Sequence, residues 1–342
     1  MDLNEFKGRL KSGNLTGWYI VSGEEDYLKK YYMNELRSAI VADESFDLFN
    51  HAAFDGVDID FGAVAEAIKS PPMMSDYKLI EWRFANLDGL KESEKAALES
   101  LFELKEEHPY AVFAIMTSSD GFDMGTQKKP SRLAARLEKG FDILNFSKST
   151  DAQLLAWLKK HFEAEGVSVD VNTLNALLFR AGRSMEILNN EVIKLCCYVK
   201  ANGRAAVTPS DVETVSSSTV ECDAFALSNA VLDKNTEKAF VALTDLKQRR
   251  VEPQAVIAML ERTYSELTSV ALLLDEGKGS HDIESILKFH PFKARLYIGA
   301  AKKFGTKRIS ESLSELCRAD AASKSGGISG YGMVEMFITR HL

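Results

Sequence analysis

The stretch GEEDYLKK, from Gly23 to Lys30, lies where a nucleotide-binding protein carries its phosphate loop. Such a loop reads G-x-x-x-x-G-K-[ST]: its glycines let backbone N–H groups surround phosphates, its lysine neutralises them and its hydroxyl binds magnesium. In this chain Leu28 replaces the second glycine, Lys29 occupies the lysine position and Lys30 replaces the hydroxyl residue. The motif is therefore present in part only, and the groups that approach phosphate and magnesium most closely are missing.

Three acidic residues, Glu24, Glu25 and Asp26, lie inside this stretch, where a triphosphate would bind. Carboxylates at the start of a helix complement its dipole, but they occupy the place that an anion would take. Each opposes a phosphate by about 1 kcal/mol or more. The sequence therefore predicts a phosphate-loop scaffold that binds no nucleotide, and no cofactor is expected.

The remaining reactive residue types show no pattern that chemistry requires. The six histidines are scattered, and the four cysteines include no C-x-x-C pair, so no metal site is predicted. The strand expected at 77–84 does not end in the paired acids that hold magnesium in an ATPase, and no Ser-Arg-Cys precedes the strand expected at 141–147. No catalytic residue is predicted.

One part of the chain is strongly basic. The net charge is −8 overall, yet residues 285–310 contain seven Lys or Arg residues and no acid. Two interpretations remain open: a surface that faces DNA phosphates, or the solvated face of a helix. The residues that would form the DNA-facing surface are Lys302, Lys303, Lys307 and Arg308.

The elements that would position these residues follow from hydrophobic periodicity. With 342 residues, 45% of them hydrophobic, the chain can form two or three domains. Apolar strand patterns alternate with amphipathic helix patterns up to Ser147, which favours an open, mostly parallel α/β sheet. The expected strands are 17–23, 46–56, 77–84, 111–119 and 141–147, and the expected helices are 27–40, 60–70, 92–108 and 131–140.

After Ser147 the strand pattern disappears and helices are expected to the end of the chain, with a polar connection at 203–218. No apolar run reaches the ~18 residues of a membrane span. The first 13 residues are charged and lack the apolar core of a signal peptide. A cytoplasmic protein without membrane contact is expected.

Four segments together resemble a known family, the delta subunit of bacterial DNA polymerase III, which is the clamp-loader subunit that opens the sliding clamp. The resemblance covers nearly the whole chain in order, and the emptied phosphate loop is part of it. The segments are WYIVSGEEDYL at 18–28, PPMMSDYKLI at 71–80, the stretch from Leu155 to Tyr198, and DAFALSNAVLDKNTEKAFVALTDL at 223–246.

The resemblance implies a fold class and partners. It implies a degenerate AAA+ α/β domain at 1–147 that binds the clamp, a small helical lid domain at 148–213, and a C-terminal helical collar domain for oligomerisation at 214–342. It further implies a hetero-pentamer with ATPase subunits and a delta-prime-type subunit, and contact with DNA through that assembly. The chain itself would not hydrolyse ATP.

The resemblance also assigns a site. In the family, two adjacent bulky apolar residues before the third strand wedge into a pocket on the clamp, and here that position is held by Met73 and Met74 after Pro72. Family members more often have Leu with Phe, although methionine adapts well at binding surfaces. The prolines end the preceding helix and stiffen the loop. The open alternative is that both methionines complete the domain's own core.

Two other functions compete with a non-catalytic clamp-loader subunit. An active AAA+-type ATPase with an atypical phosphate loop would have to bind nucleotide. A helical scaffold or regulator unrelated to replication would not bind the sliding clamp.

Overall fold

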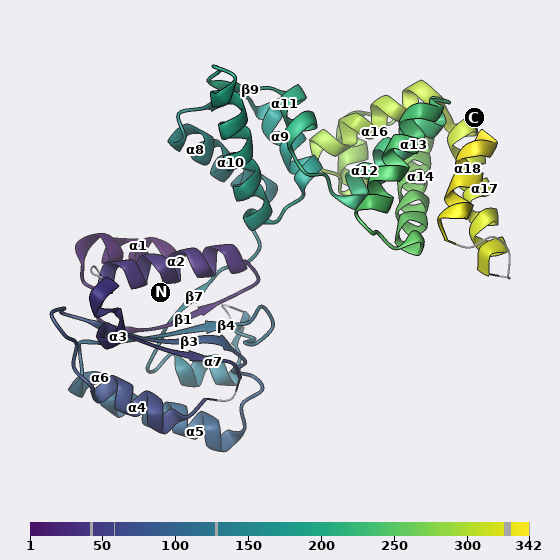
Figure 1. The fold of residues 1–342 in the computed structure, drawn as a ribbon. Helices are drawn as coiled ribbons and strands as arrows, with labels where there is room; N and C mark the ends of the chain where they lie inside the picture. The colour runs from purple at the N-terminus through teal and green to yellow at the C-terminus, as the bar shows by residue number, and fades with distance from the viewer. Residues whose placement is uncertain (42–43, 58, 127–128, 325–329, 342) are drawn as a thin grey trace. The chain divides into compact units, whose positions relative to one another are not determined.

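The computed structural model describes residues 1–41, 44–57, 59–126, 129–324 and 330–341. The chain divides into two compact units, Met1–Ser149 and Thr150–Leu342. The first is an α/β unit and the second consists almost entirely of helices (Figure 1). The predicted fold, a parallel α/β sheet followed by an all-α region, is confirmed.

The first unit is built on a parallel sheet. Among its described residues, five strands pair in the order β2-β3-β4-β1-β7, and each pairing is parallel. The central strand β4 is buried along its whole length, as its continuous apolar sequence predicts. The strands are β1 (Trp18–Ser22), β2 (His51–Asp55), β3 (Lys78–Ala85), β4 (Ala111–Thr117) and β7 (Asp142–Asn145).

Helices cover both faces of this sheet, because successive strand residues point to opposite faces. Figure 1 shows α1 and α2 on one face and α4, α5 and α6 on the other. Tyr19 and Val21 of β1 pack in the core under α1 and α2. Trp18 and Ile20, their neighbours in sequence, belong to the opposite core. The helices are α1 (Leu3–Ser12), α2 (Asp26–Ile40), α3 (Asp47–Asn50), α4 (Phe61–Lys69), α5 (Glu92–Ser100), α6 (Phe102–Glu107) and α7 (Arg132–Leu137).

Several boundaries differ from the sequence prediction. The strand expected over 46–56 starts only at His51, because the residues before it form a short 3-10 helix (Glu44–Phe46) and then α3. The helix expected over 92–108 is divided at Leu101 into α5 and α6. Helix α1 and the short hairpin of β5 (Gly125–Thr126) and β6 (Lys129–Pro130) were not predicted.

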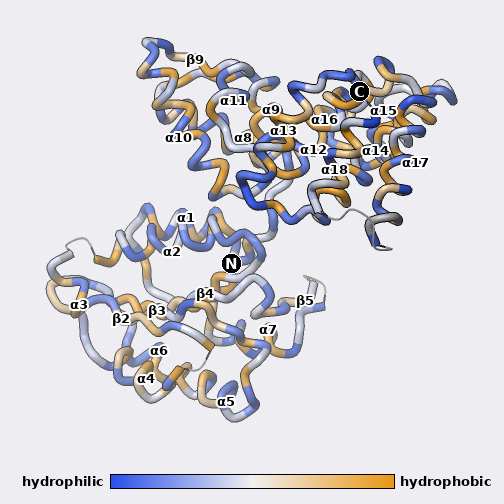
Figure 2. The backbone as a smooth tube through the Cα atoms, turned by 45° about the vertical axis from the view of Figure 1, so that its right-hand side comes forward, coloured by the Kyte–Doolittle hydropathy of each residue, from blue (hydrophilic) through white to orange (hydrophobic). Residues whose placement is uncertain are grey.

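The second unit is helical apart from one pair of two-residue parallel strands, β8 (Ser168–Val169) and β9 (Ala206–Val207), which were not predicted. Figure 2 shows polar and apolar segments alternating along its helices, the pattern of amphipathic helices that share a core. Helix α8 packs on α9 and α10, while the long α14 packs on α12, α16 and α17. The helices are α8 (Asp151–Ala164), α9 (Val171–Ala181), α10 (Met185–Ala201), α11 (Pro209–Val215), α12 (Val220–Leu232), α13 (Thr236–Gln248), α14 (Pro253–Asp275), α15 (Ser280–Leu287), α16 (Pro291–Phe304), α17 (Thr306–Lys324) and α18 (Tyr331–His341).

The boundary between the two units predicts an independently folding fragment. The division of the chain into three domains at 147 and 213 stays a prediction, whereas contacts separate residues 1–149 from the rest. Because this first unit has its own core on each face of the sheet, a fragment of residues 1–149 should unfold cooperatively in urea. Circular dichroism and tryptophan fluorescence should report one shared transition, and separate or absent transitions would contradict an autonomous unit.

Candidate functional site

The predicted phosphate loop does connect a strand to a helix, between the end of β1 and the start of α2. Its glycine serves a close approach of the chain. Gly23 has a φ of 109°, and a Cβ built on it would lie 2.3 Å from the carbonyl oxygen of Phe146. The backbone that follows β7 therefore passes directly over this position. This contact requires glycine whether or not a phosphate ever binds there.

Lys29, at the lysine position of the motif, is buried, with only 1% of the residue exposed. Its Nζ donates a 2.9 Å hydrogen bond to the carbonyl oxygen of Thr117 at the end of β4. The same atom lies 2.9 Å from the carboxylate of Asp26, which also accepts a hydrogen bond from the hydroxyl of Ser119. The ammonium that would neutralise a phosphate is thus held inside the protein by the protein's own oxygens.

The backbone of the loop is also hydrogen-bonded within the protein. The backbone N–H of Glu25 donates to the carbonyl oxygen of Phe146 at 2.9 Å. The pKa of Glu25 is raised, chiefly by burial and to a smaller extent by the neighbouring carboxylate of Asp26. Leu28 packs against the core beneath α2, while Lys30 is exposed to solvent. This loop has a structural function in joining β1, β4 and β7.

The two methionines after α4 have the opposite character. Met73 is 46% exposed and Met74 is 86% exposed, whereas Pro72 is half-buried. Large apolar side chains that stay this accessible contribute little to their own domain's core. The interpretation that both methionines complete the core is therefore wrong for Met74 and describes Met73 only in part.

The loop that carries these methionines is tied to the scaffold by its backbone. The buried amide of Asn50 donates from Nδ2 to the Met73 carbonyl at 2.8 Å and accepts from the Met73 N–H at 2.7 Å. The hydroxyl of Ser75 donates to the carbonyl of Ile40, at the end of α2. Met74 has a φ of 54°, a conformation that is uncommon outside glycine and persists where the surroundings enforce it.

The two predicted sites lie at opposite ends of the strands of the sheet. All five strands run in the same direction. Segments that precede strands therefore lie at the amino ends of the strands, and segments that follow strands lie at their carboxyl ends. The stretch from Gly23 follows β1, whereas Met73 and Met74 precede β3. A parallel α/β sheet ordinarily binds ligands at the carboxyl ends of its strands, and here the Lys29 side chain occupies that end at β1 and β4.

The basic stretch is less uniform than its sequence suggests. On α16, Lys303 pairs with Asp233 at 2.5 Å, and Lys302 is exposed. Lys307 and Arg308 line an open concavity of about 570 Å³ together with Lys234, Arg340 and the acidic Glu311 and Glu315. The four predicted residues thus share one end of α16 and the start of α17, but they form a surface of mixed charge.

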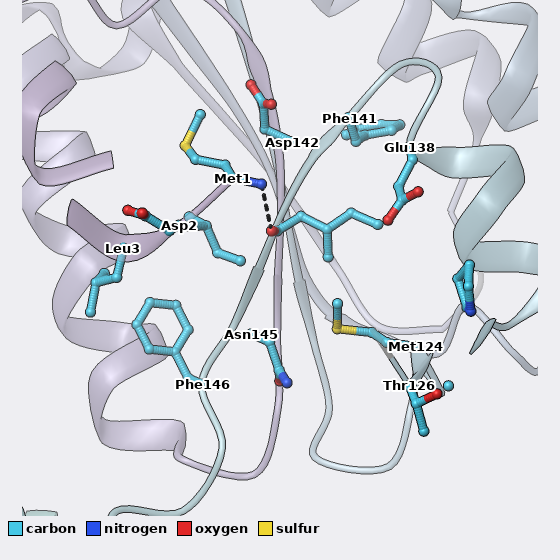
Figure 3. Close-up of a pocket in the computed structure, with 14 residues that line it drawn as sticks. Met1, Asp2, Leu3, Met124, Thr126, Glu138, Phe141, Asp142, Asn145 and Phe146 are labelled. Atoms are coloured by element: carbon cyan, nitrogen blue, oxygen red, sulfur yellow. Dashed lines mark hydrogen bonds between the residues drawn. The ribbon is translucent and has the colours of Figure 1, made fainter. Parts of the chain in front are cut away.

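A cavity of about 840 Å³, lined by residues that were not predicted to form a site, lies along the edge strand β7 (Figure 3). The amino group of Met1 donates to the carbonyl oxygen of Ile143 there, at 3.5 Å. Met124 and Thr126 line the opposite wall. This cavity contains neither the methionine pair nor Lys29.

Over the described part of the chain, no group of three or more His, Cys, Asp or Glu side chains is arranged to hold a metal ion. Within the same residues, no helix combines the length and the apolar character that crossing a membrane requires.

Together these features define a class of protein: a parallel α/β unit in which side chains of the chain itself occupy the counterpart of a phosphate loop, followed by a helical region. Residues 19–148 match the family model described as DNA polymerase III, delta subunit, and residues 221–341 match that of the C-terminal domain of the same subunit. The chain belongs to the DNA polymerase III delta-subunit family.

One known sequence and one solved structure are similar to this chain over almost its full length. The DNA polymerase III subunit delta of Bacillus subtilis (strain 168) is 22% identical over 339 residues, which cover 97% of this chain and 95% of that protein. The solved structure of the Bacillus subtilis DNA clamp loader delta protein superimposes with a TM-score of 0.57 at 21% identity, over 99% of this chain and 98% of that one. This structure supports the fold of both units.

Proposed function

We propose that this chain is a clamp-loader subunit that binds the sliding clamp through Met73 and Met74 and favours its open form. The observation that carries the proposal is an apolar pair that is exposed while its backbone is fixed by a buried asparagine. Such a pair offers contact area to a partner at a small cost in ordering entropy. The chain would act by binding the open clamp more tightly than the closed one.

The test is a direct measurement of binding. The purified chain is titrated onto immobilised sliding clamp, and the clamp alone and an unrelated ring protein serve as controls. Saturable binding with one chain per clamp interface supports the proposal. A chain that shows no affinity for the clamp, alone or within the assembled loader, would leave the family membership intact and remove the proposed function.

The other parts of the proposal concern the assembly. ATPase subunits and a delta-prime-type subunit would join this chain in a hetero-pentamer in the cytoplasm, with residues 214–342 as the oligomerising collar. ATP bound to neighbouring subunits would then expose the first unit to the clamp. DNA would contact the assembly as a whole, with Lys302, Lys307 and Arg308 as candidates for phosphate contacts on this chain.

Nucleotide should have no effect on the isolated chain. Because the Lys29 ammonium is already bonded to Thr117 and Asp26, a triphosphate would have to displace protein groups before it gained any contact. Millimolar MgATP should therefore leave the melting temperature unchanged and should not be hydrolysed. A ligand that binds only the folded state must raise the melting temperature. A clear rise with MgATP would favour the alternative of an atypical ATPase.

A further inference from the structure

A second pair of exposed apolar residues lies on α3, directly before Asn50. Leu48 is 86% exposed and Phe49 is 48% exposed, values close to those of the methionine pair. Helix α3 is only four residues long, and Arg37 holds it to α2 through two 2.9 Å contacts with the carboxylate of Asp47. The apolar side chains are thus presented by an anchored segment and not by a free loop.

The sheet places the segments that carry the two apolar pairs next to each other. Helix α3 leads directly into β2, and the methionine loop leads into β3. These two strands are hydrogen-bonded neighbours, with His51, the first residue of β2, paired to Leu79, the second residue of β3. The imidazole of His51 also contacts the carboxylate of Glu81 at 3.0 Å, which adds a side-chain link between the strands.

Asn50 connects the two segments themselves. It is the residue after Phe49, and it is buried. The nitrogen and the oxygen of its side-chain amide each form a hydrogen bond with the backbone of Met73. No other side-chain type of that size presents a donor and an acceptor in this geometry, because aspartate lacks the N–H donor and leucine lacks both groups. The amide therefore fixes the distance between α3 and the methionine loop.

We propose that Leu48 and Phe49 form one continuous clamp-binding surface with Met73 and Met74, and that Asn50 is the positioning residue that aligns the two pairs. The inference rests on the proposed function and adds to it a second anchor and the residue that sets the geometry. The clamp is the partner that would bind this surface, because both pairs lie at the amino ends of the neighbouring strands β2 and β3. A clamp bound to the methionines would therefore also contact Leu48 and Phe49. We call these four residues the apolar edge.

The first experiment removes the second anchor. The variant Leu48→Ala with Phe49→Ala should weaken binding to immobilised clamp by about 10- to 100-fold at an unchanged urea midpoint, since anchors of this kind dominate interface energies. Phe84→Ala is the matched control, because Phe84 is also an exposed phenylalanine of this unit, 56% accessible, at the opposite end of β3. It should bind the clamp as the unchanged chain does.

The outcomes separate the two proposals. If the Met73→Ala, Met74→Ala variant loses clamp binding and the Leu48→Ala, Phe49→Ala variant keeps it, the second anchor is disproved while the proposed function stands. If neither pair matters, or the unchanged chain does not bind, the proposed function itself fails. A Leu48→Ala, Phe49→Ala variant that loses self-association instead of clamp binding would assign the apolar edge to a second copy of this chain. Leu48→Asn alone repeats the test should the double change lower stability.

The second experiment tests positioning by Asn50. Asn50→Asp replaces the Nδ2 donor with an oxygen that faces the Met73 carbonyl, so the methionine loop should detach and clamp affinity should fall about 10-fold or more. In the Met73→Ala, Met74→Ala background the same change should have no further effect on affinity, because a positioning residue acts only through the pair that it positions. Equal losses of affinity in both backgrounds would show that Asn50 acts through general stability, and would overturn its assignment.

Discussion

Replacing Met73 and Met74 together by alanine should weaken clamp binding by at least ~100-fold and leave the fold unchanged. Burying a methionine side chain in a partner's pocket contributes about 1.5–3 kcal/mol, and two such anchors contribute about 3–5 kcal/mol. Met74 is almost fully exposed, so its truncation leaves hardly any cavity in this chain. Clamp affinity and the urea midpoint are to be measured on the same double variant.

The contrary outcome is equally specific. A side chain in its own core costs about 2–5 kcal/mol of stability when it is truncated to alanine. Unchanged affinity together with a lower midpoint would therefore refute clamp binding through this loop and show that Met73 contributes to stability instead. Val57→Ala serves as a control for removing exposed apolar area elsewhere in the unit.

Changing Lys29 to methionine should destabilise the first unit by about 1–3 kcal/mol, because the variant keeps the volume of the aliphatic chain but leaves the Thr117 carbonyl without this donor. The measurement is the urea midpoint, followed by tryptophan fluorescence, since Trp18 and Trp82 are buried in the same unit. Lys30→Met is the matched control: Lys30 is adjacent and exposed, and its change should cost almost nothing.

In a functional phosphate loop the same substitution would mainly weaken nucleotide binding. The result therefore distinguishes the two functions that the sequence left open. A Lys29→Met variant with an unchanged midpoint would show that the buried ammonium contributes nothing to folding. It would then remove the physical reason for expecting the loop to be closed.

The sequence predicted those parts of the structure that depend on local pattern. The continuous apolar run Trp18–Val21 specifies a strand with two buried faces, and Pro71 with Pro72 specifies where α4 must end. The apolar residues around Leu48 were interpreted as the start of β2, although they form α3. The pattern fails there because Arg37 holds that segment through an ion pair that no local rule includes.

The candidate site was only partly predictable for the same reason. Exposure of the methionine pair follows from contacts 23 residues apart in sequence, between Asn50 and Met73. The partners of Lys29 include a carbonyl 88 residues away. Likewise, the pairing of Lys303 with Asp233 divides a stretch that is uniformly basic in the sequence. Each of these contacts exists only once the strands or helices are assembled.

The burial of Lys29 makes a phosphate site at this loop hard to form by single substitutions. Restoring glycine at position 28 or a hydroxyl at position 30 would leave the ammonium bonded to Thr117 and Asp26, so neither change alone gains a phosphate contact. Glycine in place of Leu28 would also remove a side chain that packs on the core. Intermediate sequences would lose stability before they gained a ligand, and proteins near their stability threshold seldom tolerate such steps. Lineages that carry this arrangement are therefore expected to keep it.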